Sequence, residues 1–139
     1  MPRILAVDFG ERRIGLATSD ASAAVATPRR TLLRQNDESL LDALERFGRD
    51  EEIELVLFGV PRSPDGAESP FADRIRSFAA KFERRTGLPV RFHEETLTSD
   101  EAARRRRVLS RPTAREELDA MAAAVLLEDY LLSVESGSR

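Results

Sequence analysis

The first nineteen residues constrain the fold most strongly. Two apolar segments, residues 3–9 and 13–19, are separated by the short segment Gly10-Glu11-Arg12. Short apolar runs of this kind are typical of buried strands, and the short spacing between them predicts a β-hairpin. The chain therefore begins with part of a sheet, and the following residues must supply the helices that cover it.

The remaining sequence predicts one more early strand and then alternating helices and strands. A third extended segment is expected from Ala23 to Arg30. The later elements are expected in this order: a helix from Asn36 or Asp37 through Arg49, a strand over 53–60, a helix from Ser69-Pro70 to Gly87, a strand over 88–93, a helix from Thr98 into residues 104–107, and a final helix from Thr113 to about Leu132, with a frayed tail over 136–139. This order predicts an α/β fold with a mixed sheet of five strands and helices on both of its faces.

Composition limits the classes of protein and of site. The chain has 139 residues, 41% of them hydrophobic, which suits a single domain over 1–139 with a real core. Cysteine is absent, no apolar stretch reaches membrane-spanning length, and we expect a cytoplasmic protein that does not contact membranes. The single histidine, His93, excludes a His-rich zinc site and is more often structural than catalytic. Carboxylates remain as a cluster of metal ligands, and they suit Mg²⁺ or Mn²⁺.

Asp8 is the first unusual acid, because it closes an otherwise apolar strand. A carboxylate at the edge of a buried strand is costly unless it holds a metal, a cation or a phosphate-bound ion. Gly10 and Gly15 follow it, and they could let the backbone turn and a ligand approach closely. The alternative is an ordinary Asx-turn at the end of the strand.

Asp119 is the second unusual acid, and it lies in the final predicted helix. Helical spacing places it on one face with Ala122, Ala123 and Leu126. This small, apolar face should pack on the sheet and carry the acid inward. The alternative is that Asp119 pairs with an arginine or caps a neighbouring loop.

A third acid is expected where the strand through Phe92 ends, at Glu94 or Glu95. The carboxyl ends of parallel strands are where α/β sheets build their sites. Carboxylates that converge there would repel one another unless a divalent cation lay between them. Two such ions, about 4 Å apart, can activate water and stabilise the leaving oxygen in phosphodiester cleavage.

Arginine dominates the basic residues, although the net charge of the chain is −3. Twenty-one of the 22 basic residues are arginine, and they cluster at four places: Arg12-Arg13, Arg29-Arg30, Arg84-Arg85 and Arg104-Arg105-Arg106-Arg107. Arginine forks suit phosphate groups, so Arg12, Arg13 and the run 104–107 are candidates for binding a nucleic-acid backbone. The arginine bias could also reflect genome composition, and the run could be a solvated helix face.

Four segments taken together resemble the YqgF family of RNase H-like proteins, pre-16S rRNA nucleases once described as Holliday-junction resolvase-like. The matching segments keep their order and spacing over nearly the whole chain, and they are residues 4–17, residues 56–61 with Asp65-Gly66, residues 94–102 and residues 118–123. The resemblance implies an RNase H-like fold and a metal-dependent endonuclease that helps to trim the 5′ end of precursor 16S rRNA.

The resemblance also implies that Asp8, Glu95 and Asp119 are the catalytic and metal-binding acids, and it selects Glu95 over Glu94. Two departures from the family pattern occur. The family usually has Asp-Glu-Arg where this chain has Glu94-Glu95-Thr96, and its usual asparagine after Gly59-Val60-Pro61 is replaced around Ser63-Pro64. The first change could remove a phosphate contact or a salt bridge, and the second a loop contact.

The sequence therefore predicts an endoribonuclease that holds Mg²⁺ or Mn²⁺, acts on precursor 16S rRNA or a pre-ribosomal particle, and is a monomer or weak homodimer. Two alternatives stay open. One is a non-catalytic nucleic-acid-binding module of the same fold in ribosome assembly or transcription, and the other is a DNA Holliday-junction resolvase.

Overall fold

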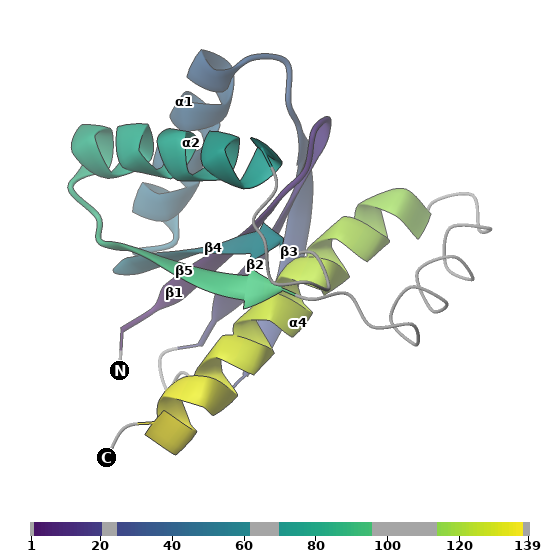
Figure 1. Cartoon of the computed structure of the whole chain (residues 1–139), viewed down its shortest axis with the longest axis vertical. Helices are drawn as coiled ribbons and strands as arrows, with labels where there is room; N and C mark the ends of the chain where they lie inside the picture. Colours follow the sequence, from purple (N-terminus) through teal and green to yellow (C-terminus); the bar gives the residue numbers. More distant parts are fainter. Residues whose placement is uncertain (1, 21–24, 62–69, 96–113, 138–139) are drawn as a thin grey trace.

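The computed structural model describes residues 2–20, 25–61, 70–95 and 114–137, which form one sheet with helices on both faces (Figure 1). The strands are β1 (Ile4–Phe9), β2 (Arg13–Ser19), β3 (Ala26–Leu33), β4 (Leu55–Pro61) and β5 (Val90–Glu95). The helices are α1 (Asp37–Asp50), α2 (Pro70–Thr86) and α4 (Ala114–Gly137). None of the helices in this part of the chain is long and apolar enough to cross a membrane.

The sheet has the strand order β3-β2-β1-β4-β5, so β1 is central. The first three strands pair antiparallel through β1–β2 and β2–β3, whereas β4 and β5 run parallel to β1. The hairpin of β1 and β2 supplies the antiparallel half, and the crossovers through α1 and α2 supply the parallel half. The predicted mixed sheet of five strands is confirmed.

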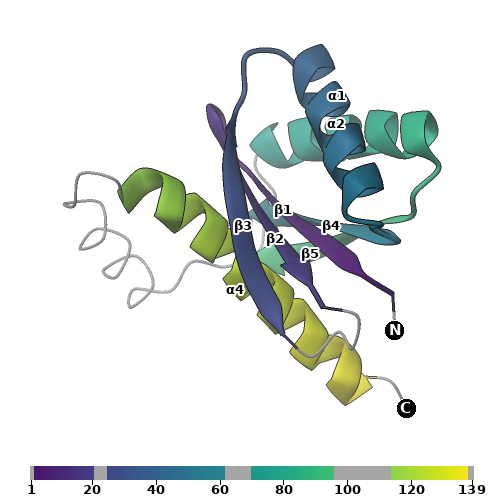
Figure 2. The same cartoon turned by 180° about the vertical axis from the view of Figure 1, so that it is seen from behind.

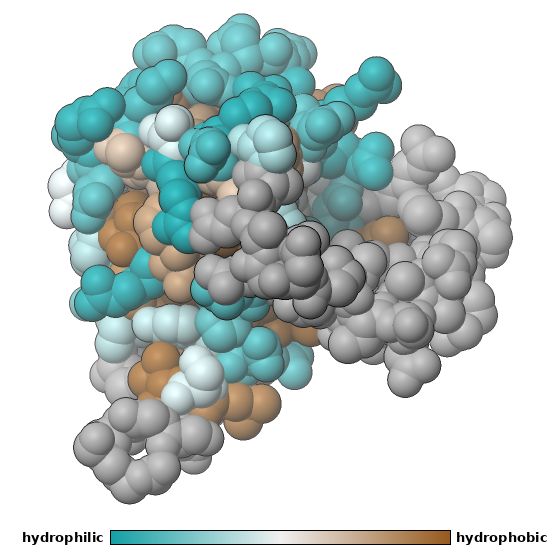
Figure 3. Space-filling model, viewed as in Figure 1, coloured by the Kyte–Doolittle hydropathy of each residue, from teal (hydrophilic) through white to brown (hydrophobic). Residues whose placement is uncertain are grey.

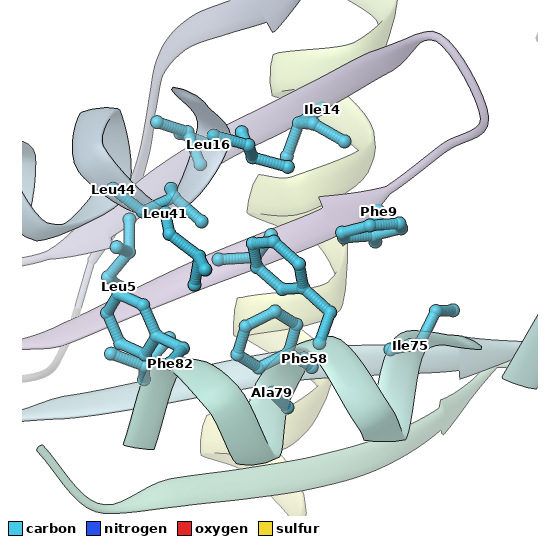
Figure 4. Close-up of a cluster of buried hydrophobic side chains, with 14 of the residues drawn as sticks. Leu5, Phe9, Ile14, Leu16, Leu41, Leu44, Phe58, Ile75, Ala79 and Phe82 are labelled. Carbon is cyan, nitrogen blue, oxygen red and sulfur yellow. The ribbon is translucent and has the colours of Figure 1, made fainter. Parts of the chain in front are cut away.

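Helices α1 and α2 cover one face of the sheet, and the larger apolar core lies between them and the strands (Figure 2). Leu5, Val7 and Phe9 of β1 point into this core, together with Phe58 of β4 and Phe82 of α2, as Figure 4 shows for four of them. The predicted start of α1 is confirmed, because the side chain of Asn36 accepts a hydrogen bond from the Ser39 amide at 2.8 Å.

Among the described residues, helix α4 covers the opposite face. Ile4 and Ala6 of β1 pack there against Ala123 and Leu127, with Leu57 of β4 beside them. Small alanine side chains let the helix lie close to the strands, and this close approach decides where its acid is held. Figure 3 shows a mostly hydrophilic surface over α1 and α2, and apolar side chains near the C-terminal end of α4, where Leu132 is 63% exposed.

Several element ends differ from the prediction. Strand β3 continues to Leu33 rather than Arg30, because it pairs with β2 as far as the Arg13–Leu33 position. Strand β5 continues to Glu95 because it pairs with β4 up to Pro61, so the two acids expected after this strand lie within it. Helix α4 runs to Gly137, beyond the predicted end at Leu132. The helix predicted from Thr98 lies outside the described residues.

Candidate functional site

Asp8 lies on the face of the sheet that α4 covers. In β1 the odd-numbered residues Leu5, Val7 and Phe9 belong to the α1–α2 core, and Ile4 and Ala6 belong to the α4 core. Because side chains alternate along a strand, the side chain of Asp8 shares the face of Ile4 and Ala6. It is half-buried, whereas every other residue of β1 is buried. The predicted position of this acid, near the carboxyl end of the central strand, is confirmed.

Gly15 brings helix α4 to Asp8. Gly15 of β2 lies directly opposite Asp8, and such pairs are roughly 5 Å apart. A Cβ atom on Gly15 would overlap the backbone oxygen of Asp119, far closer than any real side chain tolerates. The missing side chain therefore creates the space in which the backbone of α4 rests, and it places Asp119 next to the strand position that faces Asp8.

This contact corrects the expectation that Gly15 leaves room for a ligand. The space belongs to the backbone of α4 at Asp119. Gly10 serves the hairpin instead, since its amide donates to the Arg13 carbonyl at 3.0 Å and a Cβ atom there would lie 2.5 Å from that oxygen. Both glycines thus shape the site through the protein's own backbone.

Arg13 holds the carboxylate of Asp119. Its Nε donates to Asp119 Oδ2 at 2.7 Å, and the side chains of Arg13 and Asp119 are 31% and 20% exposed. Of the two alternatives to a metal-binding role for Asp119, the pairing with an arginine is present in the structure. A carboxylate has two oxygens and about four acceptor positions, so this hydrogen bond leaves Asp119 with further coordinating capacity.

The third predicted acid, Glu95, is the last residue of β5, and its backbone lies opposite Pro61 of β4. Strand β4 lies between β5 and β1, so the backbones of strands β1 and β5 are about 10 Å apart across the sheet. The side chain of Glu95 lies outside the described residues, so its distance from the other two acids stays a prediction.

His93 ties β5 to α4 two residues before Glu95. Its Nε2 lies 2.7 Å from Asp129 Oδ2, and its ring meets Tyr130 edge-on with the ring centres 5.9 Å apart. The expected structural role of His93 is thus supported by its contacts. They fix the register between the strand that carries Glu95 and the helix that carries Asp119, a link that sequence reasoning missed because His93 and Asp129 are far apart in the chain.

The donors that the described residues offer to a metal are carboxylate oxygens. Within the described ranges, no group of three or more His, Asp or Glu side chains is close enough to hold a metal ion. Asp8 is the strand partner of Gly15 and the backbone of Asp119 lies over Gly15, so the two residues supply carboxylates on the same face of the sheet. Oxygen donors of this kind fit Mg²⁺ or Mn²⁺ and are a poor set for zinc, which prefers nitrogen and sulfur.

The predicted phosphate-binding arginines fall into three groups. Arg12 is exposed in the β1–β2 turn, and its carbonyl accepts from the Arg34 amide at 2.7 Å. Arg13 is engaged with Asp119. Residues Arg104–Arg107 lie outside the described part of the chain. A role of these residues in nucleic-acid binding stays a prediction.

The sequence matches a known family and named bacterial relatives. A family model described as "RuvX: Holliday junction resolvase" matches residues 2–133. A protein of Anaeromyxobacter sp. (strain K), named "Putative pre-16S rRNA nuclease", is 39% identical over 131 residues, which are 93% of this chain and 96% of that protein. A protein of the same name from Koribacter versatilis (strain Ellin345) is 40% identical over 131 residues, 93% of this chain and 86% of that one.

The fold is similar to those of two solved structures. RuvC from Thermus thermophilus matches with a TM-score of 0.58 and 14% identity, over 96% of each chain. The Holliday junction resolvase of fowlpox virus matches with a TM-score of 0.57 and 18% identity, over 96% of this chain and 98% of that chain. At such low identity these likenesses establish the fold alone, and they confirm the predicted RNase H-like architecture. The family match and the relatives confirm the resemblance drawn from the four segments: the chain belongs to the RuvX (YqgF) family.

Proposed function

We propose that the chain is a metal-dependent endonuclease that processes the 5′ end of precursor 16S rRNA. The observation that carries the proposal is the juxtaposition of Asp8 and Asp119 on one face of the sheet, brought about by the contact between Gly15 and α4. Two partly exposed acids, one near the carboxyl end of the central strand and one on the helix beside it, have no role in the apolar core, and they suit a site open to a ligand. The names of relatives about 40% identical supply the substrate class.

In this proposal Asp8, Glu95 and Asp119 hold Mg²⁺ or Mn²⁺. When bound, such ions supply positive charge that favours the ionised form of the attacking water and neutralises the leaving oxygen. Asp8 and Asp119 provide hard oxygen donors from a strand and a helix, which are rigid elements. Arg13 holds Asp119 through Oδ2, and in this proposal the other carboxylate oxygen binds the metal.

Basic residues would bind the phosphates that flank the cleaved bond. Arg12 is exposed beside the site, and the run Arg104–Arg107 follows Glu95 in sequence. Phosphate contacts of this kind set affinity and register without reading sequence. We further propose that the protein works in the cytoplasm, as a monomer or weak homodimer, on a precursor RNA or a pre-ribosomal particle.

A second candidate activity is cleavage of four-way DNA junctions, which the description of the matching family model favours. The same acids would serve either substrate, because both reactions cleave a phosphodiester bond. A third candidate is a non-catalytic nucleic-acid-binding module in ribosome assembly or transcription. Two observations distinguish these three candidate functions: which substrate is cleaved, and whether removal of one carboxylate abolishes cleavage.

The test compares the wild type, Asp8→Asn and Asp50→Asn on 5′-extended 16S precursor RNA and on a four-way DNA junction, with Mg²⁺, Mn²⁺ or a chelator. Asp50 is an exposed aspartate at the end of α1 and is the matched control. We expect metal-dependent cleavage of the RNA by wild type and Asp50→Asn, and none by Asp8→Asn. Equal cleavage by all three, or none by the wild type with any metal, would contradict the nuclease. Preferential cleavage of the junction would establish the resolvase instead.

A further inference from the structure

A charged cavity opens on the face of the sheet opposite the proposed nuclease site, between the hairpin end of β1 and helices α1 and α2. Its volume is about 200 Å³, and its lining includes Phe9, Arg34, Asp37, Asp73, Arg74 and Lys81. Figure 4 shows Phe9 at the hairpin end of β1, on the side that α2 covers. The cavity uses none of the three acids assigned to the nuclease site.

Basic side chains outnumber acids in this cavity. Arg34, Arg74 and Lys81 face two carboxylates. One of these, Asp37, is shared by two cations: Arg34 Nη2 lies 2.7 Å from its Oδ1, and Lys81 Nζ lies 3.9 Å from its Oδ2. The local balance is positive, although the chain as a whole carries a net charge of −3.

The two arginines are held in place before any ligand arrives. Arg34 stacks over the ring of Phe9 at 5.7 Å and donates from Nη1 to the Glu11 carbonyl at 3.3 Å. Arg74 stacks over Phe71 at 5.3 Å. Arg34 also donates from Nη2 to Asp37 Oδ1 at 2.7 Å, so its guanidinium is fixed in the cavity wall. Little side-chain entropy would be lost when such a cavity takes a phosphate.

The position of the cavity connects it with the nuclease site. Phe9 contributes to the cavity, and the preceding residue, Asp8, faces the α4 side. The two sites therefore open on opposite faces at the same end of β1. A single nucleic-acid strand that passes around the β1–β2 hairpin could contact both, whereas a rigid duplex could not follow so sharp a path.

We propose that this cavity binds the phosphate backbone of the single-stranded extension of the substrate, a short way along the strand from the bond that is cleaved. Arg74 and Lys81 contact the phosphate, and Arg34 supports them from the cavity wall. This inference rests on one part of the proposed function, the binding of single-stranded nucleic acid. It holds whether or not the protein cleaves that strand.

The sequence offers a direct probe, because Lys81 is its single lysine and its side chain is 51% exposed. A reagent that acylates lysine side chains therefore has one such target in the wild type, Lys81. The rate of its modification reports on this cavity. Arg49→Lys adds a reference amine on α1, where the native arginine is 72% exposed and lines no part of the cavity. Both modification rates are measured by mass spectrometry in one sample, in the presence of a chelator to prevent cleavage.

We expect a short single-stranded oligoribonucleotide to slow the acylation of Lys81 several-fold and to leave the acylation of the reference amine in Arg49→Lys unchanged. Unchanged acylation of Lys81 at a concentration where the RNA is bound would overturn the inference and leave the nuclease proposal intact. Failure of the RNA to bind at all would count against both. Equal protection by the same concentration of inorganic phosphate would assign the cavity to a free anion and overturn the strand contact.

A second measurement covers the case in which Lys81 is shielded indirectly. Lys81→Gln should weaken RNA binding and reduce the magnitude of the slope of log affinity against log salt by about 0.7, the value for one phosphate contact to a single strand. Arg49→Gln, the matched exposed control, should leave the slope unchanged. An unchanged slope for Lys81→Gln would contradict a direct phosphate contact.

Discussion

Replacing Arg13 by glutamine should release the carboxylate of Asp119. The two side chains form one charge-assisted hydrogen bond of 2.7 Å and are 31% and 20% exposed. Fully exposed ion pairs are worth about 0–1 kcal/mol, and hydrogen bonds to charged groups about 1.5–3 kcal/mol. A partly buried pair falls between these ranges, so we expect a coupling free energy of about 1–2 kcal/mol between Arg13 and Asp119.

The assay is urea denaturation in a chelating buffer of the wild type, Arg13→Gln, Asp119→Asn and the double variant. The double-mutant cycle isolates the interaction of the pair from other effects of each change. Arg12→Gln is the matched control, because Arg12 is exposed in the same turn, and its loss should change the free energy of unfolding by less than about 0.5 kcal/mol. A coupling free energy below about 0.3 kcal/mol would refute the reasoning that Arg13 fixes Asp119.

Three further changes test the packing and the charges. Gly15→Ala should destabilise the protein by more than about 3 kcal/mol in thermal unfolding, because its Cβ would overlap the Asp119 carbonyl oxygen; near-normal stability would contradict the contact. In Gly48→Ala, on α1, the new Cβ atom would meet only ordinary contacts, the nearest at 3.5 Å. The substitution should raise the free energy of unfolding by about 0.5–1 kcal/mol in the same assay, and no gain would contradict the packing. Arg29 lowers the pKa of Glu51 below 4.5 through a hydrogen bond of 2.7 Å, so Glu51 stabilises the fold above pH 4.5 and loses this effect as the pH falls. Glu51→Gln should therefore lower the free energy of unfolding at neutral pH, measured by urea denaturation, and lower it progressively less below pH 4.5. A difference between wild type and variant that does not change with pH would contradict this.

The sequence predicted the features that depend on local pattern. The apolar runs of β1 and β2, the Asn36 cap of α1 and the proline start of α2 each depend on neighbouring residues, and the structure has them where they were expected. The face of α4 that carries Asp119 was also predicted, because helical spacing places Asp119 with Ala123, which packs on the sheet.

The remaining features depend on contacts between distant parts of the chain. The local pattern at Gly15 predicts room for a ligand, because nothing in it reveals that the backbone of Asp119 fills that space. Strand β5 extends to Glu95 because β4 pairs with it that far, a length that its own residues do not specify. The choice of Arg13 as the partner of Asp119 likewise depends on how α4 crosses β2.

The measurement that tests the central claim most directly is the anomalous diffraction of manganese in crystals of the wild type grown with Mn²⁺. The account predicts a peak at coordination distance, about 2.0–2.2 Å, from carboxylate oxygens of both Asp8 and Asp119, with Glu95 completing the site. The peak should disappear in Asp8→Asn crystals. A wild-type peak bound elsewhere, or no peak while the RNA is still cleaved in Mn²⁺, would contradict the assignment of these acids as the metal-binding site of the nuclease.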